Sequence, residues 1–382
     1  MSTPSASDLI NAQIRIVNFG NLRRIDWMIS LLVLALAAIG VVVLYSANRS
    51  ASSEMPYYVK QLTFIPVGVL LALLVMCVDY RFLVSMGPLF YALLLGFLVA
   101  VLMVGVGPEN SDVKRWLVLG PARIQPSEQS KLALIFMLAW YLSTIGRRIE
   151  RLHYFLLTFV ITAVPCLLIL KQPSLGTAVT LIPITFAMLY MAGCSRVHLV
   201  GIIVIGLGAI PITWSLIEDY QRLRVMTILD PGSDALGAGY HTIQSMITVG
   251  SGGLSGKGFM QGTQTYLSYL PEHHTDFIFS LLAEEWGFLG SVTVVMLFLA
   301  LFLRTLRVAE NSQDIAGSLL AVGIVTLLAF HVFVNIAITL GIAPVTGIPL
   351  PFMSYGRSFY LTTMLCIGVL LSVNTRRGFF DH

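Results

Sequence analysis

The stretch Asp26–Ser46, DWMISLLVLALAAIGVVVLYS, decides the fold, because one charged residue at its start is followed by none up to Ser46. A helix that crosses a bilayer needs about 20 apolar residues at about 1.5 Å of rise each. Lipid offers no partners for unpaired backbone groups, so such a run is stable there only as a helix. The stretch therefore predicts a membrane-spanning helix.

The rest of the chain repeats this pattern. The 382 residues are 57% hydrophobic and 11% charged, with a mean hydropathy of +0.84, whereas a soluble domain carries about 25% charged residues. We therefore predict an all-α, polytopic helix bundle in one membrane domain, residues 1–382, with about ten transmembrane helices. The ten apolar segments are 26–46, 62–78, 86–106, 127–145, 153–170, 175–191, 197–215, 276–303, 316–341 and 355–375.

An even number of spans places both termini on one side of the membrane, and the positive-inside rule selects that side. With N-in/C-in topology, more Arg and Lys of the short connections fall inside than outside; the inside set is Arg15, Arg23, Arg24, Arg81, Arg147, Arg148, Arg151, Arg196, Arg304, Arg307, Arg376 and Arg377. Residues 216–275 then form a long extracytoplasmic loop between the seventh and eighth helices. No apolar signal region with a cleavage site precedes the first span, which is expected to be a retained anchor. The four cysteines have no metal-binding spacing.

Basic residues are still frequent on the predicted outer face. Lys114, Arg115 and Arg123 crowd one short connection, and the long loop adds Arg222, Arg224 and Lys257. One interpretation is ordinary solvated loop charge beside lipid headgroups. The other is a binding surface for an anionic group, since phosphates are bound by clusters of Arg and Lys.

Two stretches of the long loop predict local structure. In Tyr240–Val249, YHTIQSMITV, residues Ile243, Met246 and Ile247 share one helical face, which predicts a short helix at the membrane interface. GSGGLSGKG, residues 250–258, resembles a phosphate-binding Gly-Lys loop, but Ser251 and Gly258 break the pattern. We expect a flexible turn here, with backbone N–H groups presented to an anion as the alternative.

Ionisable residues inside apolar segments need a physical reason, because each costs about 2.5–3.5 kcal/mol at the centre of a span. Glu128 and Lys131 are three residues apart and so lie on one face of a helix. They are either a self-neutralising structural pair or a positioned couple that lines an outer cavity. Glu284 and Glu285 are adjacent, so they cannot share a face and are expected to contact different neighbours.

Asp276 stands where polar residues give way to an apolar run. By spacing alone it would cap the helix that follows. A partly desolvated carboxylate at this position would also accept a proton. Glu272, His273, His274 and Asp276 match no standard metal-binding spacing.

Several blocks together resemble the SEDS family of bacterial cell-envelope proteins (shape, elongation, division, sporulation). They are KRWLVLGPARIQPSEQSKLALI (114–135), KQPSLGT (171–177), the block from DYQRLRV at 219 to EEWG at 287, and GIPLPFMSYG (347–356). The phrases GAGYHTIQS and GKGFMQGTQ resemble the rod-shape branch of the family rather than the division branch. The resemblance runs nearly end to end.

The resemblance implies a ten-helix peptidoglycan glycosyltransferase that polymerises lipid II into glycan strands at the outer face of the bacterial cytoplasmic membrane. It implies Asp276, in HTDF, as the catalytic residue. It also places family positions on Glu128, Lys131, Arg115 and Trp116. To these substrate-binding candidates we add Lys114, Arg222, Arg224, Lys257 and His274. Arg115, Lys131, Arg222, Arg224 and Lys257 are our candidates for the pyrophosphate, and Glu128 would hold Lys131 in place. Two positions depart from the family pattern: Ser174 replaces the aspartate of QPDLGT, and Arg357 replaces the second glycine of SYGGS.

The implied reaction inverts the donor sugar, so it needs a base for the acceptor hydroxyl and positive charge for the departing pyrophosphate, but no covalent intermediate. We expect Asp276 to act as the base. No cofactor is required by the sequence, and Mg²⁺ or Mn²⁺ would be the cation to share the pyrophosphate charge. Expected partners are lipid II, a class B penicillin-binding protein and other elongation proteins, with no nucleic acid. A lipid II flippase and a non-catalytic scaffold are the alternative functions.

Overall fold

The fold is described from a computed structural model. It describes residues 17, 25–48, 56–107, 114–119, 122–209, 211, 215, 222–223, 226–227, 238–263 and 274–376. Arg224, Glu272 and His273 lie outside these residues, and so does much of the predicted loop 216–275.

Each of the ten predicted apolar segments overlaps a helix. The helices are α2 (Trp27–Ala47), α3 (Tyr57–Cys77), α5 (Gly87–Val104), α6 (Pro126–Ile145), α7 (Leu152–Leu170), α8 (Leu175–Met191), α9 (Arg196–Gly208), α14 (Ile278–Glu310), α15 (Ile315–Thr339) and α16 (Arg357–Thr375). Shorter elements connect them: α4 (Tyr80–Ser85), the 3-10 helix η3 (Gly146–Glu150) and α12 (Ala238–Ser251). An antiparallel hairpin of β1 (Leu117–Leu119) and β2 (Ala122–Ile124) precedes α6.

Helix length and apolarity identify a membrane protein. Among the described residues, eight helices are long and apolar enough to cross a bilayer, while α8 and α9 are shorter apolar helices. The helix bundle predicted from the sequence is therefore confirmed, with the β1–β2 hairpin as a small addition. The number of ten spans and the N-in/C-in topology stay predictions.

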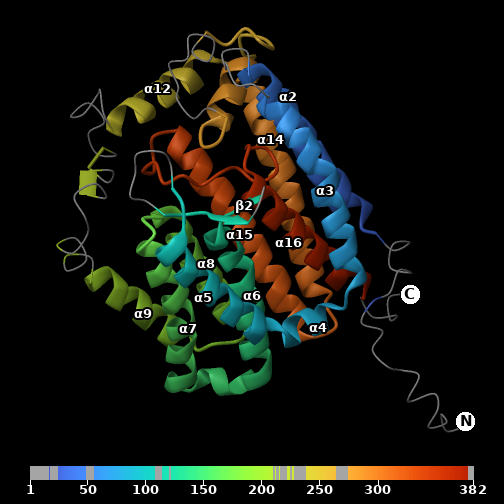
Figure 1. The fold of residues 1–382 in the computed structure, drawn as a ribbon, viewed down its shortest axis with the longest axis vertical. Helices are drawn as coiled ribbons and strands as arrows, with labels where there is room; N and C mark the ends of the chain where they lie inside the picture. The colour runs from blue at the N-terminus through green and yellow to red at the C-terminus, as the bar shows by residue number, and fades with distance from the viewer. Residues whose placement is uncertain are drawn as a thin grey trace, which may run out of the picture.

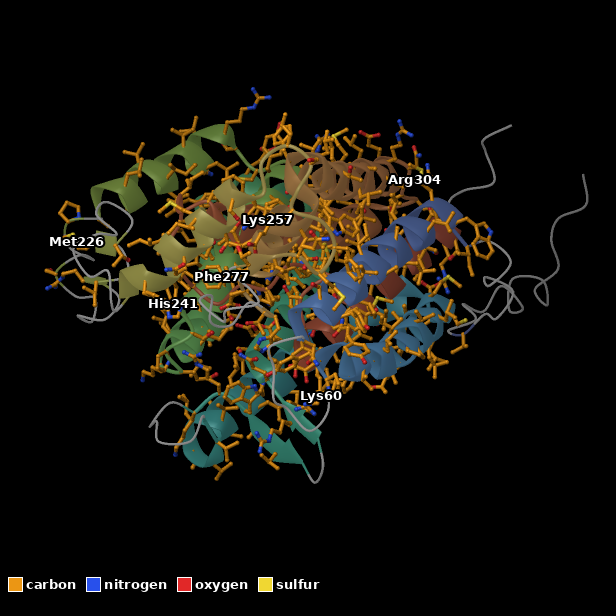
Figure 2. The ribbon with its side chains drawn as sticks, turned by 90° about the horizontal axis from the view of Figure 1, so that it is seen from above. Lys60, Met226, His241, Lys257, Phe277 and Arg304 are labelled. Atoms are coloured by element: carbon orange, nitrogen blue, oxygen red, sulfur yellow. The ribbon has the colours of Figure 1, made fainter. Side chains whose placement is uncertain are left out.

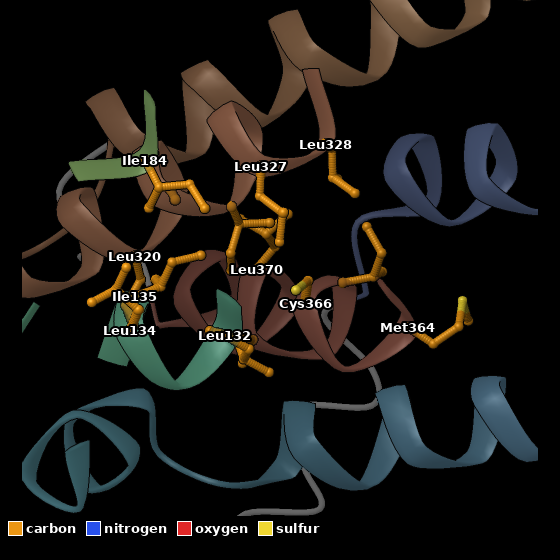
Figure 3. Packing of buried hydrophobic residues seen from close by; sticks show 14 of the residues in the cluster. Leu132, Leu134, Ile135, Ile184, Leu320, Leu327, Leu328, Met364, Cys366 and Leu370 are labelled. Carbon is orange, nitrogen blue, oxygen red and sulfur yellow. The ribbon is translucent and has the colours of Figure 1, made fainter. Parts of the chain in front are cut away.

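Helix α15 lies at the centre of the bundle. It packs against α14, α8 and α6, while α3 packs along α16 and α5 along α6 (Figure 1). Leucine and isoleucine side chains from α6, α8, α15 and α16 interlock in the core between these helices (Figure 3). Gly368 allows α16 to approach α3 closely, because a Cβ there would lie 2.7 Å from the carbonyl oxygen of Ala72.

Helix α12 confirms the short helix predicted over Tyr240–Val249. Met246 and Ile247 are exposed, whereas Ser245 is buried and donates to the carbonyl of Thr339 at the end of α15 (2.8 Å). Its hydroxyl is also 2.8 Å from that of Ser280 in α14. Helix α12 is thus attached to α14 and α15 near their ends, and its alignment in the membrane interface stays a prediction.

In the part of the chain that the structure describes, three ion pairs join helices on the side predicted to be cytoplasmic. Arg304 pairs with Asp26 (2.9 Å), Arg376 pairs with Asp79 (3.2 Å), and Arg81 pairs with Asp314 (2.8 Å). Figure 2 shows Arg304 well away from Lys257 and Phe277. Asp26 and Asp314 also cap α2 and α15 through backbone N–H groups, so these carboxylates fix where the helices begin.

Candidate functional site

The main chain that carries Asp276 is held by three successive hydrogen bonds. The carbonyl of His274 accepts from the N–H of Tyr355 (3.0 Å), and that of Thr275 accepts from the hydroxyl of Ser354 (2.6 Å). The carbonyl of Asp276 accepts from the side-chain amide of Asn335 (2.9 Å). A segment ahead of a helix is thus fixed by tertiary contacts.

Asp276 itself is partly buried. The N-cap of α14 is Phe277, whose side chain makes no capping hydrogen bond, so Asp276 stands one residue ahead of the capping position. The carboxylate lies beside Gly347, where an added Cβ would be 3.8 Å from Oδ2. Gly347 has φ +71° and belongs to the irregular backbone between α15 and α16. Irregular backbone at membrane depth occurs where it is buried in protein or lines a cavity.

The side chains around His274 are aromatic. Its ring stacks on Tyr57 at 4.0 Å between centroids with an interplanar angle of 12°, and Tyr355 lies 6.2 Å away. Nζ of Lys60 lies over the Tyr57 ring, 5.5 Å from its centroid. These contacts fix the N-terminal end of α3 to the segment that carries Asp276. Phe277, the N-cap residue of α14, stacks with His241 of α12 (Figure 2).

Glu128 and Lys131 form the predicted ion pair, deep inside the bundle. Nζ of Lys131 is 2.6 Å from Oε2 of Glu128 and 3.2 Å from Nε2 of His331, and it lies over the ring of Phe359 at 5.1 Å. Lys131 is 1% exposed. The charge is therefore neutralised within the protein, as the structural interpretation expects, and the side chain does not reach an outer surface.

The basic residues before α6 lie closer to the surface. Arg115 donates through Nε to the carbonyl of Gln172 (3.3 Å) and through Nη2 to that of Pro173. Lys114 is exposed and donates to the carbonyl of Met103 (3.0 Å). The main chain of Trp116 exchanges hydrogen bonds with Val106. Arg115 thereby joins the connection before α6 to the QPSLGT turn.

The QPSLGT turn continues toward Asp276. Gly176, at the start of α8, packs so closely that an added Cβ would lie 2.6 Å from the carbonyl oxygen of Thr346. Thr346 directly precedes Gly347, the neighbour of the Asp276 carboxylate. Arg115 and Asp276 therefore stand at the two ends of one continuous chain of contacts.

The glycine-rich residues 250–258 are not the flexible turn expected from the sequence. The N–H groups of Lys257 and Gly258 donate to the carbonyls of Glu284 and Glu285 (both 3.0 Å), and the N–H of Phe288 donates to Gly253 (2.9 Å). These bonds satisfy α14 where Gly287 breaks its helical geometry (φ +66°). Glycine is needed because of this close approach: a Cβ on Gly252 would lie 1.9 Å from the carbonyl oxygen of Ala283.

Glu284 and Glu285 contact different neighbours, as predicted. Glu284 is fully buried and pairs with Lys257 at 2.7 Å, and the same ammonium lies 2.8 Å from the hydroxyl of Thr263. Glu285 accepts from the hydroxyl of Ser46 in α2. Lys257 is thus engaged with a carboxylate, and its predicted contact with substrate stays a prediction, as does that of the partly buried Arg222.

An apolar cavity of about 520 Å³ lies between α3, α5, α6 and α16, under the β1–β2 hairpin. Its wall includes Phe90, Phe97, Leu132, Phe136 and Leu365, with Leu117 and Ile124 from the hairpin; Gln129 is the polar residue among the lining side chains. Leu117 is two residues from Arg115, so the cationic connection and the apolar cavity adjoin.

The family model FtsW/RodA/SpoVE, described as cell cycle protein, matches residues 26–378. The chain belongs to this family.

Relatives of the FtsW/RodA/SpoVE chain match it over 92–94% of its length. It is 39% identical over 357 residues to peptidoglycan glycosyltransferase MrdB of Escherichia coli K12, covering 92% of this chain and 94% of the relative. A solved chain described under the structural coordination of polymerization and crosslinking by a peptidoglycan synthase complex has a TM-score of 0.79 and 33% identity, covering 94% and 99% of the two chains. Rod shape determining protein RodA of Thermus thermophilus has a TM-score of 0.69 and 31% identity, covering 92% and 97%. The family and its long apolar helices make the chain an integral membrane protein.

Two site residues of this family member escaped the sequence reasoning: His331 and Asn335, both in α15 and both buried. His331 contacts Lys131, and Asn335 contacts the main chain of Asp276. The signal was present, because polar side chains four residues apart inside an apolar span share one helical face and require partners. Among the described residues no group of three or more His, Cys, Asp or Glu could hold a metal ion.

Proposed function

We propose that the chain is a peptidoglycan glycosyltransferase that polymerises lipid II at the outer face of the bacterial cytoplasmic membrane, with Asp276 as the general base. Its relative MrdB carries the name of this activity. The observation that carries the site assignment is the carboxylate of Asp276, which lies at the start of α14 against Gly347 on a main chain held by three hydrogen bonds.

The chemistry requires a base at one place. The acceptor sugar hydroxyl attacks the anomeric carbon of the donor, its proton passes to the carboxylate of Asp276, and the bond from the anomeric carbon to the pyrophosphate oxygen breaks. Inversion in one displacement leaves no role for a nucleophilic carboxylate. General-base catalysis of this kind contributes about 10²–10⁴ in rate. A carboxylate that is partly withdrawn from water and rigidly attached is suited to this task.

The leaving pyrophosphate requires positive charge. Lys131 is too deeply buried for direct contact, so we assign it, with Glu128, to the support of the site. Arg115 and Lys114 are the better candidates, because both lie on the connection that leads from α5 into the hairpin, and Arg115 joins this connection to the QPSLGT turn. The guanidinium of Arg115 presents five N–H donors in a planar fork, a geometry that suits a phosphate. A bound Mg²⁺ or Mn²⁺ would assist here and stays a prediction.

The polyprenyl part of the substrate suits the apolar cavity. Its walls are mainly leucine and phenylalanine side chains between α3, α5, α6 and α16. The cationic residues Arg115 and Lys114 adjoin its hairpin end. An amphiphile with a charged head and an apolar tail would therefore find the two environments that it needs side by side. This arrangement explains why a sugar-transfer enzyme is built within the membrane.

A class B penicillin-binding protein is the partner that we propose, with other elongation proteins beside it. A solved chain of the same fold is described within a synthase complex that coordinates polymerization and crosslinking, and a polymerase supplies the strands that a crosslinking enzyme consumes.

The test is a polymerisation assay with the purified chain, its penicillin-binding protein, fluorescent lipid II and a gel that resolves glycan strands. The proposal predicts a ladder of strands that depends on Asp276. The same protein in proteoliposomes separates the alternatives, because a flippase moves lipid II between leaflets without lengthening it. A scaffold would leave strand synthesis to its partner and would be indifferent to Asp276→Asn.

A further inference from the structure

Two polar side chains of α15, Asn335 and His331, contact backbone carbonyls next to the Asp276 carboxylate. Asn335 is fully buried, and its single Nδ2 atom donates to the carbonyl of Asp276 (2.9 Å) and to that of Ile348 (2.8 Å). One side-chain nitrogen therefore joins the two backbone segments that meet at the Asp276 carboxylate. One of them carries Asp276, and the other contains Gly347, which lies next to Oδ2.

His331, one turn earlier on α15, holds the same segment one residue further along. Its Nδ1 is 3.3 Å from the carbonyl of Pro349, and its Nε2 is 3.2 Å from Nζ of Lys131. An ammonium only donates, so Nε2 accepts and the proton of the neutral ring is on Nδ1, where it donates to Pro349. The stack on Phe359 at 4.7 Å fixes the ring.

Asn335 and His331 hold two consecutive residues of the same backbone segment. The carbonyls of Ile348 and Pro349 are consecutive acceptors, and their donors Asn335 and His331 are four residues apart, which is one turn of a helix. The series of contacts begins at the buried Glu128–Lys131 pair, passes through His331 and Asn335, and ends at the main chain of Asp276. The buried ion pair gains a role in this way without touching substrate.

We propose that Asn335 is a positioning residue for Asp276: its amide sets the separation between the main chain of Asp276 and the Gly347–Pro349 segment, and His331 with Lys131 fixes that segment from the adjacent turn. The inference rests on the proposed function, because it gives Asn335 its effect through Asp276. A shift of about 1 Å in a reacting group can lower a rate about 100-fold. The loss of the two hydrogen bonds from the Asn335 amide is therefore expected to lower the rate measurably.

A series at position 335 tests this. Asn335→Thr keeps one donor, Asn335→Leu keeps the branching at Cγ without a donor, and Asn335→Asp keeps the shape but places acceptors against two carbonyls. We expect kcat for strand synthesis to fall in the order Asn, Thr, Leu, Asp, with the Leu variant about 10- to 100-fold below the natural chain. KM for lipid II is expected to stay within about twofold, because the substrate contacts are elsewhere.

Ser372→Ala is the matched control. Ser372 is also fully buried and donates across elements to a backbone carbonyl, that of Val78 (2.6 Å), about 20 Å along α16 from its outer end by helical rise. Its loss should lower the melting temperature and leave kcat within about twofold. If Asn335 had a purely structural role, its variants would lose kcat only in proportion to their loss of melting temperature, as Ser372→Ala does.

The inference is overturned if Asn335→Leu, or Asn335→Thr where the Leu variant does not fold, keeps the kcat of the control. Failure of the proposed function looks different, because then the natural chain itself makes no strands or Asp276→Asn makes them normally.

Discussion

Gly347 lies against the carboxylate of Asp276, with room for a Cβ 3.8 Å from Oδ2 but with a backbone φ of +71° that favours glycine. The wall beside the proposed base is therefore a residue that contributes only backbone. This leaves space for a sugar hydroxyl next to the carboxylate, and it makes the position sensitive to any side chain.

We predict that Gly347→Ala loses most of its strand synthesis, because the methyl group narrows this space and the left-handed backbone is strained by about 1–2 kcal/mol. Gly193→Ala is the matched control, since Gly193 has φ +78° and nothing within 4 Å of an added Cβ. Both variants should lose similar thermal stability, measured by melting in detergent, while only Gly347→Ala loses activity. Equal activity in the two variants would contradict the assignment.

The buried ion pair predicts an asymmetry in stability. Lys131→Met leaves Glu128 buried without its cation, and breaking such a pair costs about 3–5 kcal/mol. The double variant Glu128→Leu with Lys131→Met removes both charges and should regain part of the melting temperature. The measurement is thermal unfolding of the three proteins, and a double variant less stable than Lys131→Met would show that the pair is not coupled as the 2.6 Å contact indicates.

The cavity predicts an effect on substrate affinity. Ala133 lines it, so Ala133→Phe should raise KM for lipid II several-fold and change kcat little, because the tail and not the reacting sugar is displaced. Ala38→Phe adds the same ring at an exposed position of α2 and should leave KM unchanged. A normal KM in Ala133→Phe would place the polyprenyl chain elsewhere.

The glycine-rich segment predicts a difference between two glycines two residues apart. Gly252→Ala places a methyl group 1.9 Å from the carbonyl oxygen of Ala283, and such overpacking costs about 1–3 kcal/mol. At Gly250 in α12 an added Cβ meets nothing within 4 Å, and alanine is favoured over glycine in a helix by about 0.5–1 kcal/mol. Limited proteolysis and thermal unfolding should therefore show Gly252→Ala destabilised and Gly250→Ala unchanged or more stable; a tolerated Gly252→Ala would mean that the segment is a loose turn.

Much of the bundle was predictable because lipid imposes a length and a polarity on each helix. The limits are visible at helix ends. Helix α3 begins at Tyr57, before the predicted residue 62, since Lys60 and Gln61 lower the local hydropathy without breaking the helix. Helix α14 continues to Glu310 for the same reason at Arg304 and Arg307.

The site was predictable only where its signal is local. Glu128 and Lys131 are three residues apart and could be paired from spacing, whereas Asn335 finds its acceptors 59 and 13 residues away in the sequence. The tight packing of residues 250–258 depends on the break in α14 at Gly287, which no local pattern specifies. Tertiary contacts therefore decide which polar residues support Asp276.

Strand synthesis by Asp276→Asn, at equal abundance and melting temperature, tests the central claim most directly. Asp314→Asn is its matched control, because Asp314 caps α15 and pairs with Arg81 on the opposite side of the bundle. We predict that Asp276→Asn makes no glycan ladder from fluorescent lipid II, whereas Asp314→Asn makes strands at a rate near that of the natural chain. Normal strands from folded Asp276→Asn would contradict a carboxylate base at this position.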